Sequence, residues 1–437
     1  MMCKLVRFWA VLFLCAGCLS GCQVKTDVGG DVLIEPQAPD MSGEKTLTFF
    51  APVEGKSSGA VSYRKMIDQY NKTHDVQVVF EGIATADGYN EYLEERLDAG
   101  KGDDIFIVNE DSVKPLYSKG YLYDMSSLPA FQKLDVNAKE EAIIGDTAYC
   151  MPMDMTAYAM YVNLDVLEQY GLKPPESLEE FDVCCRRMKE QGGTPISLSR
   201  WHATAVPTIA NGLYRLYGSP DYKELIQKLN TGDILAGDYM LEGFQMFRKA
   251  MDEGWYGENL TAKEVDGLRA GQQDIPDFAA GRTAFYFGPL EYIPWVTETN
   301  PQVDFQVQGV PVPGKTVLLT SMVSRLCVNA DSASLEDALD FVSYLSEECY
   351  RESVESGEAL LPVYGNADFV LNYEQMRPAY ETYLSGGRIP AENMQLKFGC
   401  WDTVRELCLG MADGMTAREA ADEYNKIQME QIIRYNK

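Results

Sequence analysis

The chain has 437 residues, 46% of them apolar, which is enough to bury a sizeable core and to form two or three domains. Its 66 acidic residues outnumber the 38 basic ones, so the formal net charge is −28. This charge argues against nucleic acid as a partner, because neutralising phosphates requires lysine and arginine. It also argues against electrostatic docking on anionic lipid.

The first 21 residues are predicted to be a lipoprotein signal peptide. Lys4 and Arg7 precede an apolar run over residues 8–19, which is too short to span a bilayer. The run ends in Leu-Ser-Gly-Cys at residues 19–22, which resembles a bacterial lipobox. We therefore expect lipid attachment at Cys22 and a protein anchored to the cell membrane on its extracytoplasmic side.

Residues 22–45 are predicted to be a flexible tether, because they contain several glycines and prolines and no helical period. Seven cysteines would remain in the folded part, at positions 150, 184, 185, 327, 349, 400 and 408. An odd number cannot all pair within the chain, and none of them has the CxxC spacing of a zinc site. We expect buried thiols, with no metal and no cofactor.

Strands and helices alternate from Thr46 onward. The pattern predicts strands over 46–53, 76–80 and 105–108, with helices over 61–70 and 89–97 between them. Further strands are expected over 157–162, 195–198 and 283–287, and further helices over 178–190, 335–345 and 417–433. This alternation favours an α/β fold with mostly parallel sheets flanked by helices.

Five segments carry a family resemblance. They are GDDI…GYLYDM (102–125), GDTAYCMP…MYVNLD (145–165), YGLKPPESLEEF (170–181), FAAGRTAF (278–285) and VPVPG (310–314). In this order they resemble motifs of the family 1 extracellular solute-binding proteins, the sugar-binding lipoproteins of ABC transporters. One departure is Asp103, which stands where the family usually has proline.

The resemblance implies a two-lobed, periplasmic-binding-protein-like fold with hinge strands between the lobes. The N-terminal lobe is expected over 46–155 and 318–365, and the C-terminal lobe over 156–317 and 366–437. Such a protein is a monomer that captures a carbohydrate, here expected to be an oligosaccharide, in the cleft between its lobes. It then delivers the ligand to an ABC permease in the membrane.

Aromatic side chains are the first candidates for the binding site, because sugars present flat C–H faces. Trp401, in FGCWDTVR, resembles a sugar-stacking tryptophan of the maltodextrin-binding protein. That protein also has two aromatics after a Gly-Pro pair. Here only Tyr292 remains, and Trp295 is expected to replace the other. Trp201 follows a predicted strand, whereas its neighbour His202 is expected to be exposed or hydrogen-bonded rather than a ligand contact.

Polar candidates follow the ends of the predicted strands. Glu54 comes after the first strand, and Asn109, Glu110 and Asp111 come after the third. Asp154 lies at a predicted crossing between the lobes. Carboxylates and amides at these positions could bind the hydroxyl groups of a sugar.

Other functions are compatible with parts of this sequence. The same fold could bind a peptide or a polyamine, or act as a ligand sensor for a membrane receptor. The GKSSG segment at 55–59 matches the GxSxG motif of hydrolases, but that chemistry needs a histidine base late in the chain. Only His74 and His202 are present, so we do not expect an enzyme.

Overall fold

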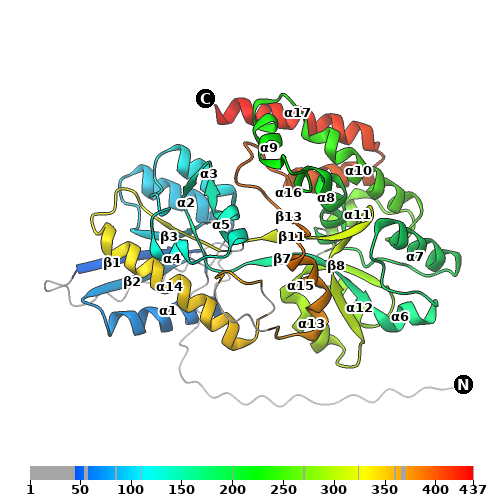
Figure 1. Ribbon diagram of the computed structural model, residues 1–437, viewed down its shortest axis with the longest axis horizontal. Coiled ribbons are helices and arrows are strands. Elements are labelled where there is room, and N and C mark those ends of the chain that lie inside the picture. The colour runs from blue at the N-terminus through cyan, green and yellow to red at the C-terminus, as the bar shows by residue number, and fades with distance from the viewer. Residues whose placement is uncertain are drawn as a thin grey trace, which may run out of the picture.

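The computed structural model describes residues 45–53, 58–83, 86–108, 110–199, 201–268, 271–322, 324–358, 361–365 and 371–436. Two α/β lobes lie side by side, and strands β7 (Thr156–Asn163) and β11 (Lys315–Ser321) run through the middle between them (Figure 1). The two strands pair with each other in antiparallel register, Leu319 opposite Tyr158. The expected two-lobed α/β class is therefore confirmed.

The sheet of the N-terminal lobe has five strands. Their order is β2 (Val76–Gly82), β1 (Lys45–Ala51), β3 (Ile105–Val108), β12 (Arg325–Val328) and β6 (Met151–Pro152). The helices of this lobe are α1 (Ser58–Asn71), α2 (Ala86–Asp98), α3 (Glu110–Ser118), α4 (Pro129–Gln132), α5 (Val136–Ala142) and α14 (Leu335–Ser356). A small hairpin of β4 (Ile143–Ile144) and β5 (Thr147–Ala148) follows α5.

The second sheet belongs to the C-terminal lobe. Its main path is β10 (Val310–Val312), β11, β7 and β8 (Phe285–Pro289), while β13 (Arg388–Pro390) pairs with β11 and β9 (Phe305–Gln308) with β7. The longer helices around it are α7 (Leu178–Glu190), α8 (His202–Tyr217), α9 (Tyr222–Thr231), α10 (Ala236–Asp252), α16 (Trp401–Ala412) and α17 (Ala417–Tyr435). Shorter ones are α6 (Leu164–Gln169), α11 (Ala262–Gly267), α12 (Asp274–Ala279), α13 (Ile293–Thr299), α15 (Arg377–Leu384), η1 (Leu290–Tyr292) and η2 (Glu374–Met376).

Local sequence signals fix several of these ends. The Thr416 hydroxyl accepts from the backbone N–H of Glu419, and the Glu419 carboxylate reaches back to the N–H of Thr416, so α17 begins with a full capping box. Ser177 caps α7 in the simpler way, by accepting from the N–H of Glu180. Gly357 ends α14 with a φ of 76°, a conformation that costs a glycine little.

Strand direction differs from the prediction. β1 is parallel to β2 and β3, as expected for strands joined by α1 and α2. Across the described residues only one other pair, β11 with β13, is parallel, and the remaining pairs are antiparallel. The expectation of mostly parallel sheets was wrong, because strands that carry the chain between the lobes enter a sheet from its opposite end.

The strand predicted over 195–198 is also absent as a regular element. Ile196 forms one isolated bridge to Phe285, and the N–H of Ser197 donates to Phe285 O at 2.8 Å. Pro195 lacks an N–H, which prevents the pairing from extending toward the N-terminus. The segment is nevertheless held against β8, so it still leads directly into α8.

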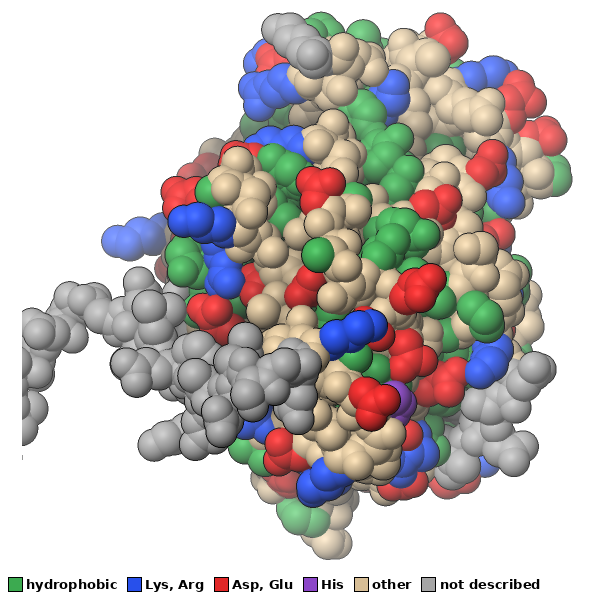
Figure 2. All heavy atoms as spheres, turned by 90° about the vertical axis from the view of Figure 1, so that its left-hand side faces the viewer, with side chains coloured by type: hydrophobic (Ala, Val, Ile, Leu, Met, Phe, Trp, Pro, Cys, Tyr) green, Lys and Arg blue, Asp and Glu red, His purple; other side chains and the backbone are tan. Residues whose placement is uncertain are grey.

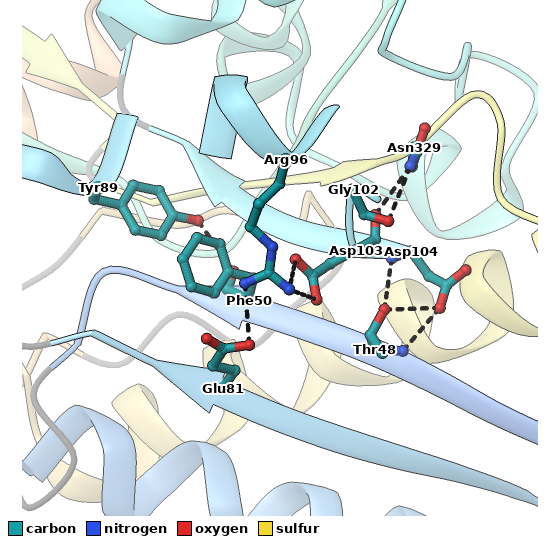
Figure 3. Close-up of polar contacts among 9 residues, drawn as sticks. All are labelled: Thr48, Phe50, Glu81, Tyr89, Arg96, Gly102, Asp103, Asp104 and Asn329. Atoms are coloured by element: carbon teal, nitrogen blue, oxygen red, sulfur yellow. Dashed lines mark hydrogen bonds and ion pairs between the residues drawn. The ribbon is translucent and has the colours of Figure 1, made fainter. Parts of the chain in front are cut away.

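A charged cluster links the strands of the N-terminal sheet to α2 (Figure 3). The Arg96 guanidinium lies 3.0 Å from Glu81 and 2.9 Å from a carboxylate oxygen of Asp103, and it stacks on the ring of Phe50 at 4.7 Å. Asp104 accepts hydrogen bonds from the N–H and hydroxyl of Thr48, at 2.8 and 3.0 Å. Asp103, the departure from the family motif, therefore has a role in joining α2 to the sheet.

The seven expected thiols are free. Six are buried and Cys349 is half-buried, as the prediction of small buried hydrophobes requires. On the surface of the N-terminal lobe in Figure 2, acidic and basic side chains are interspersed. Within the described ranges, none of the helices combines the length and the apolar character that crossing a bilayer requires.

Candidate ligand-binding site

A cleft of about 890 Å³ opens between the two lobes. The N-terminal lobe contributes α3, through Lys114, Pro115 and Ser118. The C-terminal lobe contributes Tyr158 on β7, Trp401 at the start of α16, and the last turn of α17. Because both lobes line it, a molecule bound there would contact both at once.

Five aromatic rings of the C-terminal lobe form a continuous row of ring contacts, which we call the aromatic wall, and two of them, Tyr158 and Trp401, line the cleft. Trp401 stacks on Tyr158 with ring centroids 4.6 Å apart, and His202 lies 5.3 Å from Tyr158. His202 is in turn 5.8 Å from Tyr292, which stacks on Trp295 at 4.8 Å and 13°. Flat rings of this kind offer stacking surfaces for the C–H faces of sugar rings.

The position of Trp401 depends on a carboxylate. Glu392 accepts hydrogen bonds from the backbone N–H groups of Cys400, at 2.9 Å, and of Trp401. These N–H groups stand at the start of α16, where a negative charge is favoured by the helix dipole. Trp401 is thereby held at the mouth of the cleft with its ring only partly buried.

His202 occupies the centre of the aromatic wall. Its side chain is 6% exposed, and among the described atoms its Nδ1 has no hydrogen-bond partner. Burial lowers the pKa of His202 to about 4, so the ring is neutral at physiological pH. The expectation that this histidine would be exposed was therefore wrong, because three neighbouring rings cover it.

Two carboxylates lie beside the wall. Glu291 precedes Tyr292, accepts a hydrogen bond from the Thr156 hydroxyl on β7, and has a pKa raised to about 7 by burial. The negative charge of Asp154 nearby raises the pKa of Glu291 further. Asp154 itself accepts from the N–H of Ser324 at 3.2 Å, next to the start of β12. The two acids thus stand where the chain passes from one lobe to the other.

Comparison with known proteins identifies the family. The family model of the bacterial extracellular solute-binding protein matches residues 56–349. The chain belongs to this family. Strand β7, which carries Tyr158, and η1, which carries Tyr292, both lie inside the matched range.

Known members of the solute-binding family resemble this one only distantly in sequence. MelE of Bacillus subtilis, a melibiose/raffinose/stachyose-binding protein, is 21% identical over 374 residues, covering 83% of this chain and 84% of MelE. A binding protein of Brucella abortus is 22% identical, and this chain spans about half of its length, 52%. A family 1 solute-binding protein from Bifidobacterium longum subsp. infantis superposes with a TM-score of 0.72 at 17% identity, covering 89% of this chain and all of that one.

Of the predicted contacts, Trp401 alone is among the described residues that line the cleft of this solute-binding protein. Trp401, Tyr292 and Trp295 belong to the aromatic wall, with Trp295 49% exposed. Trp201 is 40% exposed and stands outside the wall, beneath the guanidinium of Arg405 at 5.9 Å. Asp154 lies at the crossing between the lobes, beside Glu291. All of them remain predictions as ligand contacts.

The other predicted residues cannot be placed in this way. Cys22, Glu54 and Asn109 lie outside the described residues, as do the signal peptide and almost all of the tether. Glu110 and Asp111 fall in the first turn of α3, but their side chains also lie outside what the structure describes. Among the described side chains, no group of three or more His, Cys, Asp or Glu is arranged to bind a metal ion.

Sequence reasoning missed several residues of the cleft. Tyr158 was predicted only as part of a strand, although it is the half-buried position in an otherwise buried β7 and a side chain there faces away from the core. Glu291, which lies beside the aromatic wall and outside the cleft lining, was also not predicted, although it adjoins the motif residue Tyr292. The cations Lys114, Lys397 and Arg434 come from three separate elements, and no local pattern of sequence connects them.

Proposed function

We propose that this chain is the capture subunit of an ABC importer and binds a carbohydrate, an oligosaccharide, in the cleft between its lobes. The observation that carries the proposal is the aromatic wall, in which Trp401 and Tyr158 present stacked rings to a cleft of about 890 Å³. Support also comes from relatives of the same fold, which include a RafE complex with raffinose and a chitin oligosaccharide binding protein.

In this proposal the lobes comprise residues 46–155 with 318–365 and residues 156–317 with 366–437. β7 and β11 act as the hinge strands, and the lobes close on the ligand. The protein is a monomer anchored by lipid at Cys22 on the extracytoplasmic face of the cell membrane, and it delivers its ligand to a permease. Ligand should therefore compact the protein in small-angle scattering, and binding without compaction would argue against a closing cleft.

Two alternatives use the same fold. A peptide or polyamine ligand would need carboxylates along the cleft, whereas four of the six charged residues among its described lining are basic: Lys114, Arg325, Lys397 and Arg434, against Glu392 and Asp402. This lining favours a carbohydrate over a polyamine. The second alternative, a sensor that hands its ligand to a membrane receptor, would leave the binding site unchanged.

Titration calorimetry with a panel of oligosaccharides, peptides and polyamines tests the ligand class. We expect at least one oligosaccharide to bind, without turnover of its glycosidic bonds, and Trp401→Ala to weaken that binding. If the protein binds only cationic ligands, the carbohydrate assignment is wrong while the family assignment stands.

Anchoring is tested separately, in cells. Cys22→Ala should release the protein from the membrane fraction, because the acyl acceptor is gone. Cys349→Ala is a matched control that removes a half-buried thiol of the folded part. A Cys22→Ala protein that still pellets with membranes after a high-salt wash would overturn the anchoring proposal.

A further inference from the structure

The cleft carries positive charge in a protein whose net charge is −28. Three of its cations stand around the mouth: Lys114 on α3 of the N-terminal lobe, Lys397 in the segment before α16, and Arg434 in the last turn of α17. Lys114 reaches across the lobes, where its Nζ donates to Asn393 O at 3.3 Å. Cations from both lobes therefore face the same space.

Two of these cations lack a carboxylate partner. Lys397 is half-buried, and its Nζ donates to Asn436 Oδ1 at 2.7 Å and lies 5.2 Å from the centre of the Tyr435 ring, both neutral groups. Arg434 is exposed, and no carboxylate of the described residues lies within ion-pair distance of it or of Lys397. Elsewhere on α17, by contrast, Arg418 pairs with Asp422 and Lys426 with Glu423.

Neither acid of the described lining forms an ion pair with Lys397 or Arg434. The Glu392 carboxylate accepts from the backbone of Cys400 and Trp401, and Asp402 lies 3.3 Å from Arg405. The basic residues of the lining therefore outnumber its acidic residues by four to two, and two of the cations have no ion-pair partner among the described residues.

We propose that the ligand is an anionic carbohydrate, one whose sugar rings stack on Trp401 while its carboxylate or sulfate groups meet Lys397, Arg434 and Lys114. This inference rests on the proposed function and specifies its substrate class.

The test compares matched acidic and neutral glycans by titration calorimetry. The probes are uronic acid trisaccharides with their methyl esters, and sulfated disaccharides with their desulfated forms, each at 20 mM and 300 mM salt. We expect an acidic form to bind at least tenfold more tightly than its neutral partner and to weaken with salt, because exposed charges are screened. The ester and sulfate pairs decide between a carboxylate and a sulfate ligand.

Arg434→Gln is a more specific test than a substitution of Lys397. Lys397 also contacts α17, so replacing it could shift that helix. Arg434→Gln should lower the affinity for the acidic glycan about fivefold to tenfold and leave the affinity for its neutral partner unchanged. Lys426→Gln, on the same helix but outside the cleft lining, removes the same charge and should change neither.

The outcomes separate the two proposals. If acidic and neutral forms bind equally, or if only neutral sugars bind, the proposal of an anionic ligand is wrong. The proposal that the protein captures a carbohydrate would still stand. No binding by any acidic glycan at either salt concentration also overturns the proposal of an anionic ligand. Binding of cationic ligands alone overturns both this inference and the proposed function.

Discussion

Among the described residues, the charged cluster of the N-terminal lobe and the aromatic wall of the C-terminal lobe each contain a buried polar atom without a hydrogen bond, Asp103 Oδ2 and His202 Nδ1, but Asp103 Oδ2 lies 2.9 Å from the guanidinium of Arg96. In the cluster, Arg96 contacts both Glu81 and Asp103, and the side chain of Asp104 accepts from Thr48 (Figure 3). The hydroxyl of Ser332 also donates to Asp104. In the wall, the Nδ1 of His202 is buried without a hydrogen-bond partner, and Glu291 has its pKa raised to about 7 by burial.

We expect the cluster to contribute to stability and the aromatic wall to contribute to binding. A buried polar atom without a hydrogen bond destabilises the folded protein. A ligand that forms a hydrogen bond with such an atom would offset this cost. In the cluster, the cation of Arg96 already lies beside Asp103 without any ligand. We therefore expect substitutions in the cluster to change folding alone, and substitutions in the wall to change binding.

Arg96→Met should produce the largest change in stability. It leaves the carboxylate of Asp103, which is only 3% exposed, without its cation. Breaking such a pair costs about 2–4 kcal/mol once the 21% exposure of Arg96 is allowed for. Urea unfolding should show this loss, while the affinity for any bound sugar stays the same.

Lys65→Met is the control for that prediction. Lys65 forms an ion pair with Glu352 at 3.1 Å but is 71% exposed, so its removal should cost less than about 1 kcal/mol. Equal effects of the two substitutions would show that the cluster does not stabilise the lobe.

Trp401→Ala should have the largest effect on binding. Stacking does not depend on the orientation of individual hydroxyl groups. The variant should therefore weaken the binding of every accepted sugar by about 2 kcal/mol, or roughly thirtyfold. Tyr92→Ala removes a similarly exposed ring outside the cleft lining, 38% exposed, and should leave affinity unchanged. Calorimetry would contradict the stacking role if Trp401→Ala lowered affinity for one sugar only.

Asp154→Asn should alter selectivity instead. A lost hydrogen bond to a charged group costs about 1.5–3 kcal/mol, but only for the ligand that used it. The variant should therefore change the order of affinities in a sugar panel. A uniform loss across the panel would show that Asp154 acts through the crossing between the lobes, where it accepts from Ser324, rather than on the ligand.

The sequence predicted regular elements well and long-range neighbours poorly. The helix over 178–190 and the strand over 105–108 were predicted at their observed bounds, because their apolar patterns are local. Helix α3 was missed, and Pro115 inside it obscures the helical pattern. At the site, a family motif pointed to Trp401, but its partner Tyr158 is more than 240 positions away and is brought there only by β7.

Glu291 should make stability depend on pH. Its pKa is raised from 4.5 to about 7 on folding, so between these values the folded protein binds more protons than the unfolded chain. Stability should therefore rise as the pH falls from 7 to 4.5. Glu291→Gln should remove that segment of the profile and stabilise the protein at pH 8 by about 1–2 kcal/mol. Glu355→Gln, 63% exposed on α14, should leave the profile unchanged.

His202→Phe should have the smallest effect and gives the most direct test of the comparison. The substitution keeps an aromatic ring between Tyr158 and Tyr292 and removes the unsatisfied Nδ1, so stability at pH 7 should rise by about 1 kcal/mol. Because the pKa of His202 is lowered to about 4 from 6.5, the wild-type protein loses stability as the pH falls through this window, and the variant should not share that loss.

If Nδ1 is kept free for a sugar hydroxyl, the same variant should bind its ligand about fivefold more weakly. A gain in stability with unchanged affinity would mean that the wall binds by stacking alone, and a loss of stability would mean that His202 is a packing residue like those of the N-terminal lobe.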